Sequence, residues 1–229
     1  PPSPPVFMQI QIVYSKRKTI SLIISNDGNL QIRAPFGTKR STIDNIVQDK
    51  KCWIERKISE IKQIALPAKK TYNNGEKFYY LGKIYELKIV KADKNSVSLL
   101  DGILLLSIKK QSNPRLVLIN WYKTQALSFI KTRLNYYSNL LNCTFKSITI
   151  TSAKKRLGSC DFNGNLRFSF YNILLDQAYI DYVVIHELCH LFYLNHSKNF
   201  WQKVESILPD FKQKRLWIRK NFYIIANSL

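Results

Sequence analysis

Residues 186–196 read HELCHLFYLNH and contain all three histidines of this 229-residue chain. The segment holds an H-E-x-x-H motif with a further histidine at its eleventh position. On a helix, His186 and His190 would lie on one face about 5–6 Å apart at Cβ, so that both imidazoles can bind one metal ion. Glu187 is rotated away from the first ligand and can direct its carboxylate at a water molecule. The spacing therefore predicts a metal-dependent hydrolytic site.

The third ligand is expected from the chain that follows this helix. Asn195 is a good residue to end a helix in the left-handed conformation, which would let His196 emerge as the chain turns back. Ser197 can then cap a second helix. Three histidines with an open fourth position are typical of a catalytic zinc site. Glu205 and Asp210, which lie further along, remain alternative third ligands.

The chemistry of such a site follows from the charge of the ion. Zinc lowers the pKa of its bound water to about 7, and Glu187 would take the proton as general base and pass it to the leaving group. Tyr182 and Tyr193 could line the same face, but aromatic residues on a helix face usually pack in the core. We therefore assign Glu187 as the catalytic residue and His186, His190 and His196 as the metal ligands.

The composition indicates a folded globular protein, with 45% hydrophobic and 13% aromatic residues. No apolar run approaches the roughly eighteen residues that a membrane helix needs, and the first residues lack the basic and apolar regions of a signal peptide. The four cysteines form no C-x-x-C pair, which favours reduced thiols. We therefore expect a cytoplasmic protein that does not insert into a membrane.

The net charge of +21 would attract anions, and nucleic acid above all. The C-terminal run FKQKRLWIRKNFYI interleaves basic residues with Trp217 and Phe222, a mixture that suits phosphate contact and base stacking. Two simpler explanations compete. An AT-rich genome would spread lysines over a solvated surface, and an amphipathic helix would bury Phe211, Ile218 and Phe222 in the core.

The first half of the chain has the pattern of a small α+β unit. Alternating residues over 6–35 enclose an Asn-Asp-Gly turn, and further strand-like runs occupy 77–91 and 96–108. Between them, helical spacing begins after Ser41, a plausible N-cap. Residues 1–110 are thus expected to form a β-rich subdomain of short antiparallel strands with one helix.

The second half predicts a long helix from Pro114 to about residue 142, because proline suits the first helical position. Two short strands should follow, separated by KKRLGSCDFNG, and Asp176 should cap the helix that carries the H-E-x-x-H motif. We place the domain boundary near residue 111, so that residues 111–229 form the catalytic part.

The run IDYVVIHELCHLFYLNHSKNFW resembles the signature of the YgjP-like metallopeptidases, small bacterial zincins related to the SprT-like and WLM proteases. KKRLGSC resembles the family segment just upstream of it, and GEKFYYLGKIYELKI, KCWIERKI and LPDFKQKRLWI resemble other parts of the family. The resemblance implies zinc bound by His186, His190 and His196, Glu187 as the catalytic acid and base, and a compact zincin-like core over 111–229.

Two positions depart from the family pattern. Leu157 stands where the family usually has tryptophan, and Ser169 stands where asparagine is common. Neither is a ligand, so the departures concern the shape of the substrate cleft. Arg156, Ser159 and Cys160 are expected near that cleft, where Gly-Ser turns often simply close a loop.

The leading interpretation is a zinc metallopeptidase acting on a peptide or protein substrate. One alternative is a zinc hydrolase of a non-peptide substrate such as a nucleotide, although no glycine-rich phosphate loop supports it. Another is a DNA-associated SprT-like protease or nucleic-acid-binding module. Strong salt dependence of DNA binding would favour this last alternative.

Overall fold

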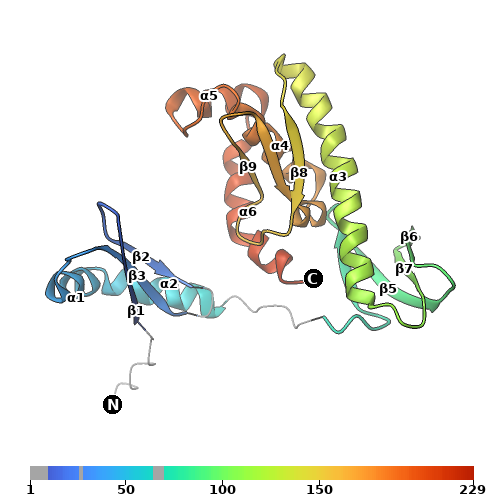
Figure 1. Ribbon diagram of the computed structural model, residues 1–229, viewed down its shortest axis with the longest axis horizontal. Helices are drawn as coiled ribbons and strands as arrows, with labels where there is room; N and C mark the ends of the chain where they lie inside the picture. The colour runs from blue at the N-terminus through green and yellow to red at the C-terminus, as the bar shows by residue number, and fades with distance from the viewer. Residues whose placement is uncertain (1–9, 26–27, 64–69) are drawn as a thin grey trace. The chain divides into compact units, whose positions relative to one another are not determined.

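The computed structural model describes residues 10–25, 28–63 and 70–229 (Figure 1). The chain divides into two compact units, Pro1–Leu66 and Pro67–Leu229. This division lies well before the boundary that we placed near residue 111. The fold is of the mixed α+β class, as expected.

The first unit is a three-stranded sheet with two helices. Its strands are β1 (Ile10–Ser15), β2 (Ser21–Ile24) and β3 (Leu30–Pro35), in the order β1-β3-β2. Inward-facing residues of β3 alternate along the strand and pack with one isoleucine from each helix; the buried set is Leu30, Ile32, Ala34, Ile43 and Ile54. This small apolar core holds α1 (Arg40–Asp49) and α2 (Lys51–Gln63) to the sheet.

Two expectations for this unit need correction. The single expected helix is interrupted at Lys50, whose φ of −99° and ψ of 8° end α1 before α2 begins. The N-cap residue is Lys39, not Ser41, and its side chain makes no capping hydrogen bond. The β2–β3 pair is antiparallel, as the turn motif predicts, but turn residues 26 and 27 lie outside the described residues.

The second unit begins with a four-stranded sheet that shares a core with the long helix after it. The strands are β4 (Lys77–Tyr80), β5 (Lys83–Lys91), β6 (Ser96–Leu100) and β7 (Ile103–Ile108), in the order β4-β5-β7-β6. Phe78 and Leu104 belong to the same buried cluster as Tyr122 of α3 (Pro114–Leu141), and the Tyr122 hydroxyl donates to the Tyr79 carbonyl at 2.8 Å. This shared core explains why the chain does not divide near 111.

A second sheet of this unit supports the histidine-bearing segment. Its strands are β8 (Ser147–Thr151), β9 (Gly158–Cys160) and β10 (Asn165–Ser169), in the order β8-β10-β9, so that β9 is an edge strand. A 3-10 helix, η1 (Phe170–Leu174), leads into α4 (Gln177–Cys189), α5 (Lys198–Ile207) and α6 (Phe211–Ala226). Helix α4 packs against α3, α5, α6 and β9.

Strand direction differs from the expected antiparallel arrangement. Each of the three sheets contains one parallel pair: β1 with β3, β5 with β7, and β8 with β10. In every case the strand lying between the pair in sequence runs antiparallel to the second member. Alternation of apolar residues is the same in both directions, which is why the sequence did not distinguish them.

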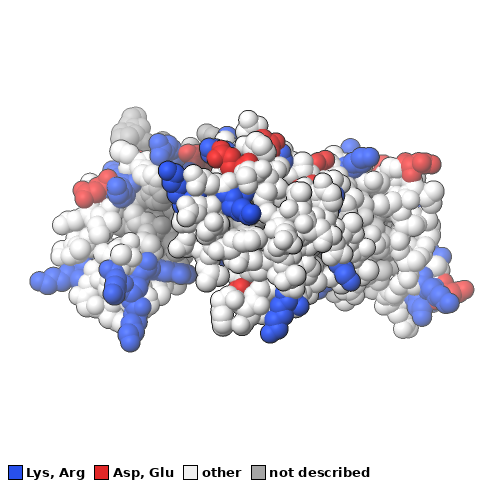
Figure 2. Space-filling view, turned by 90° about the horizontal axis from the view of Figure 1, so that it is seen from above, with Lys and Arg blue, Asp and Glu red and all other residues white. Residues whose placement is uncertain are grey.

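The C-terminal helix α6 is amphipathic. Phe211, Ile218 and Phe222 are buried, whereas Arg219 and Lys220 are exposed. Figure 2 shows one face of the surface, on which Lys and Arg lie in several separate groups with Asp and Glu among them. Within the described part of the chain, no helix is both long and apolar enough to span a membrane.

Candidate metal centre

Helix α4 carries the first two histidines into the interior of the second unit. Asp176 is its N-cap, and the side chain accepts a hydrogen bond from the Ala178 N–H at 2.9 Å, as predicted. The helix is apolar on nearly all sides because other elements cover it. Glu187 lies in its last turn, and His190 is the C-cap residue.

The chain leaves α4 earlier than the sequence suggested. The N–H groups of Phe192 and Tyr193 both bond to the Cys189 carbonyl, which tightens the final turn directly after His190. Asn195 does not adopt the expected left-handed conformation. Its side chain instead accepts from the Ser197 N–H at 3.2 Å, and Ser197 caps α5 as predicted. His196 is held between these two hydrogen-bonded residues.

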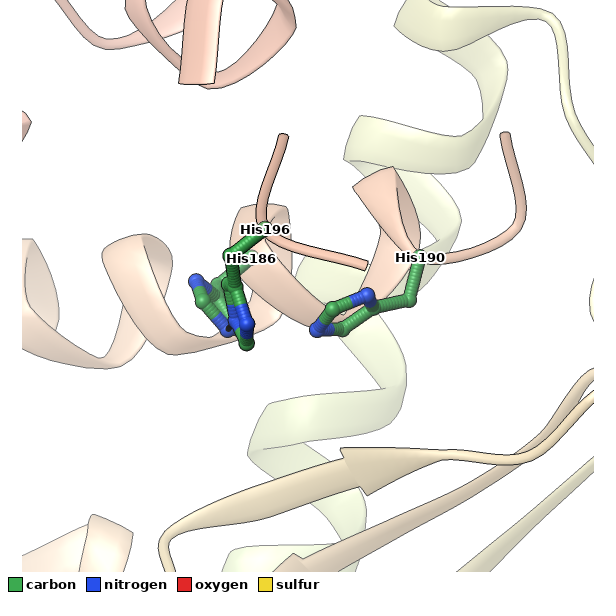
Figure 3. A group of neighbouring side chains, drawn as sticks. All are labelled: His186, His190 and His196. Atoms are coloured by element: carbon green, nitrogen blue, oxygen red, sulfur yellow. Dashed lines mark hydrogen bonds between the residues drawn. The ribbon is translucent and has the colours of Figure 1, made fainter. Parts of the chain in front are cut away.

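The three imidazoles converge on one point (Figure 3). His186 Nε2 and His196 Nε2 are 3.0 Å apart, and one ring nitrogen from each histidine lies within 4.8 Å of the others. Tetrahedral zinc with ligand nitrogens at 2.0–2.1 Å places those nitrogens about 3.3 Å apart. The cluster is therefore close to the geometry that a metal ion requires.

A main-chain contact orients the second histidine. His190 Nδ1 lies 3.0 Å from the Tyr193 carbonyl oxygen, which can only accept. Nδ1 therefore carries the proton and donates it to this carbonyl. Nε2 is then unprotonated, and its lone pair is free to bind a metal ion. The backbone of Tyr193 thus has a role at this site, while its ring is partly buried against the core.

Two aromatic residues of α5 form the support beneath the histidines. The Phe200 ring is fully buried, and its centroid is 5.0, 4.6 and 4.8 Å from the rings of His186, His190 and His196. The Trp201 ring stacks on His196 at 5.4 Å. The spacing of the histidines does not point to either residue. The available signal was their position at the third and fourth places after the Ser197 cap, which turns both toward α4.

Glu187 follows His186 in α4 and is buried, with only 5% of the residue exposed. Its Oε2 atom has no hydrogen-bond partner in the described protein. Burial raises the pKa of Glu187 to about 8, and the nearby Arg156 charge acts in the opposite direction. A buried polar atom without a partner is costly, so this oxygen is suited to a partner that is not part of the chain.

Strand β9 comes unusually close to this carboxylate. A Cβ atom added to Gly158 would lie 2.6 Å from both Cγ and Oε1 of Glu187. Any side chain at this position would overlap the carboxylate, so glycine is what leaves room for Glu187 against the edge strand. No local sequence pattern predicts this contact, because it joins two elements that lie apart in the chain.

The environment favours neutral imidazoles. Burial lowers the pKa of His186 to about 3, and the charges of His190, His196 and Arg215 act in the same direction. The pKa of His196 is lowered as well, again first by burial. Neutral imidazole is the form that binds a metal ion. The donor set therefore fits a divalent ion such as zinc.

The alternative third ligands are engaged elsewhere. Glu205 accepts from Lys212 at 3.1 Å, and Asp210 pairs with Lys214. Within the described ranges, the group of metal-ligating residues that the structure brings together consists of the three histidines. Tyr182 is buried with its ring 5.9 Å from His186, as expected for a packing residue.

Leu157 and Ser169, the two departures from the family pattern, both make hydrogen bonds around the loop before β9. The Leu157 carbonyl accepts from the Ser169 N–H and the Asn172 side chain, both at 2.8 Å. The Ser169 hydroxyl is buried and donates to the Ala153 carbonyl at 2.6 Å. Cys160, in β9, is a free thiol whose pKa is raised to about 11 by burial and by the nearby Glu187. Among these residues, Cys160 is thus near Glu187.

The family model described as YgjP-like, metallopeptidase domain, matches residues 18–221. The chain belongs to the YgjP-like metallopeptidase family. Two solved structures also show some similarity to this YgjP-like chain, the metallopeptidase zymogens abylysin of Pyrococcus abyssi and jannalysin of Methanocaldococcus jannaschii. Their sequence identities are 23% and 24% and their TM-scores 0.37 and 0.36, and each comparison covers 40% of this chain and 94% of the other. Among curated proteins, none matches the chain.

Proposed function

We propose that this YgjP-like metallopeptidase is a zinc-dependent hydrolase of peptide bonds, with His186, His190 and His196 as metal ligands and Glu187 as general base. One observation supports the proposal above the others. Three imidazole nitrogens converge on one point, and Glu187, which follows the first of these histidines in α4, has a buried carboxyl oxygen with no hydrogen-bond partner among the described residues. A water molecule between an ion and Glu187 would satisfy that oxygen.

The protein groups have distinct tasks in this mechanism. Zinc, when bound by three neutral imidazoles with an open fourth position, supplies Lewis-acid activation of water and of the substrate carbonyl. Glu187 accepts a proton from the attacking water at Oε2 and returns it to the leaving nitrogen as the C–N bond breaks. Its burial and its close packing against Gly158 of β9 restrict the movement of the carboxylate, which supports a positioned general base.

The same proposal includes a zincin-like character for the histidine-bearing part of the second unit, Pro67–Leu229, and a cytoplasmic location. A DNA-associated role remains a separate prediction. The contacts of α6 limit how it would work, since the Trp217 ring stacks on Tyr179 at 3.9 Å and Phe222 is buried. Binding through this helix would therefore use phosphate contacts of exposed cations and not base stacking.

Substitution of Glu187 by Gln tests the catalytic assignment. The amide keeps the shape of the side chain but cannot take a proton, so we expect peptide hydrolysis to fall by about 10²–10⁴-fold with bound zinc unchanged. The matched control is Glu205→Gln, the same exchange on the neighbouring helix at an exposed residue. Full activity in the Glu187 variant would disprove the role of Glu187, and loss of zinc from the Glu205 variant would disprove the ligand assignment.

A further inference from the structure

Next to the histidines, α6 presents a cation with no carboxylate partner of its own. We propose that Arg215 binds a carboxylate of the substrate, so that the protein prefers peptides with an acidic residue close to the cleaved bond. This inference rests on the proposed peptidase function and names its substrate class. Three observations support it: the aromatic support of the guanidinium, the pairing of its neighbours and the charge around the site.

Trp201 connects Arg215 to the metal ligands. The guanidinium carbon of Arg215 lies 4.5 Å from the centroid of the Trp201 ring. The same ring stacks on His196 at 5.4 Å with an interplanar angle of 22°, and it is 5.7 Å from the His186 ring. A guanidinium resting on an aromatic face is oriented before any ligand arrives, so less entropy is lost when it forms hydrogen bonds.

The acidic residues nearest to Arg215 in sequence are already paired with lysines. Glu205 accepts from Lys212, and Asp210 accepts from Lys214 one turn later in α6. In the part of the chain that the structure describes, no carboxylate lies within ion-pair distance of Arg215, and its side chain is exposed. Its five N–H donors are therefore free for a ligand, and their fork geometry matches a carboxylate.

The positive charge of Arg215 lies close to the site. Its guanidinium rests on the Trp201 ring, which in turn contacts the rings of His186 and His196. Arg156 lines a cavity of about 290 Å³ together with Gly158, whose Cβ position would meet the Glu187 side chain. Cations thus lie close both to the histidines and to the strand that contacts Glu187, an arrangement that attracts an anionic substrate.

The test compares pairs of fluorescent peptides that differ only by Glu or Gln at one position near the cleaved bond. Two quantities are measured: kcat/KM for the zinc-loaded protein, and Kd by fluorescence anisotropy with the non-hydrolysing Glu187→Gln protein. For the best position we expect about 10-fold preference for Glu, the usual size for one exposed charge-assisted hydrogen bond. Arg215→Ala should abolish the preference with zinc content unchanged, and Arg215→Lys should retain part of it because it keeps the charge but not the fork.

Arg219→Ala is the matched control, since Arg219 is an exposed arginine one turn further along α6. It should keep the full preference for Glu. Equal effects of the two alanine variants, or no preference at any position in the wild type, would overturn the role of Arg215. Anisotropy separates this result from the proposed function: a Glu preference in binding that Arg215→Ala removes supports the inference even if the wild type cleaves none of the peptides.

Discussion

Replacement of Gly158 by alanine would test how closely Glu187 is held against β9. The added Cβ would lie 2.6 Å from Cγ and Oε1 and 2.9 Å from Cδ of Glu187, whereas ordinary contacts begin at 3.4 Å. The carboxylate would therefore have to move by about 1 Å, and a displacement of that size in a catalytic group costs on the order of 10²-fold in rate. The crowding should also reduce the free energy of unfolding by about 1–3 kcal/mol.

The histidines are untouched by this change, so zinc content should remain that of the wild type. Peptide hydrolysis, metal content and urea unfolding, measured on the same preparation, separate a displaced carboxylate from a lost metal or an unfolded chain. Ser98→Ala is the control, because Ser98 is an exposed residue of β6, an edge strand of a different sheet. Activity within about twofold of the wild type in a folded, zinc-loaded Gly158→Ala protein would refute the close approach.

Three further predictions concern the support of the site and the stability of the second unit. Phe200→Leu should weaken zinc binding about 10-fold in a chelator competition, because the ring contacts all three histidines. Unchanged zinc affinity would mean that the Phe200 ring does not orient the histidines. Arg133→Met should lower the unfolding free energy by about 3 kcal/mol, because it leaves the Asp181 carboxylate without its partner. This carboxylate is only 10% exposed and lies 2.6 Å from Arg133 Nε. A decrease below about 1 kcal/mol in urea unfolding would contradict this prediction. Burial acts to raise the pKa of Glu76, but hydrogen bonds from Thr71 and from the Tyr72 N–H outweigh it and hold the pKa below its ordinary value. A carboxyl whose pKa is lowered by folding stabilises the protein at a pH above the pKa of the unfolded chain, and this stability is lost as the pH falls through the pKa of the folded protein. Glu76→Gln should therefore remove part of the decrease of Tm at acid pH. The same decrease of Tm in the variant and the wild type would contradict this contribution of Glu76.

The metal-ligating cluster was the part of the structure best specified by local sequence. His186 and His190 share a helix face because of their spacing, and no other histidine exists to compete with His196. Caps also follow from short-range chemistry, so Asp176 and Ser197 lie where the sequence placed them. The conformation of Asn195 was not predicted in this way. The helix ends earlier, where the N–H groups of Phe192 and Tyr193 bond to the Cys189 carbonyl, and Asn195 is not left-handed.

Contacts between distant elements were not predictable in the same way. The approach of Gly158 to Glu187 depends on how β9 packs on α4, and nothing near either residue encodes that packing. Strand direction was not predicted for a similar reason. The alternation of apolar residues shows which face of a strand is buried, but not which strand pairs with it or in which direction. The division of the chain depends on Phe78 and Tyr122 sharing one core, a tertiary fact that composition shifts do not reveal.

Metal content of the wild type and of His196→Ala, purified together and analysed by elemental analysis, tests the central claim most directly. The three-histidine site predicts about one zinc per wild-type chain and a clear loss in the variant. Wild-type protein that holds no zinc after reconstitution, or a variant that retains all of it while folded, would contradict the assignment of His186, His190 and His196 as the ligands.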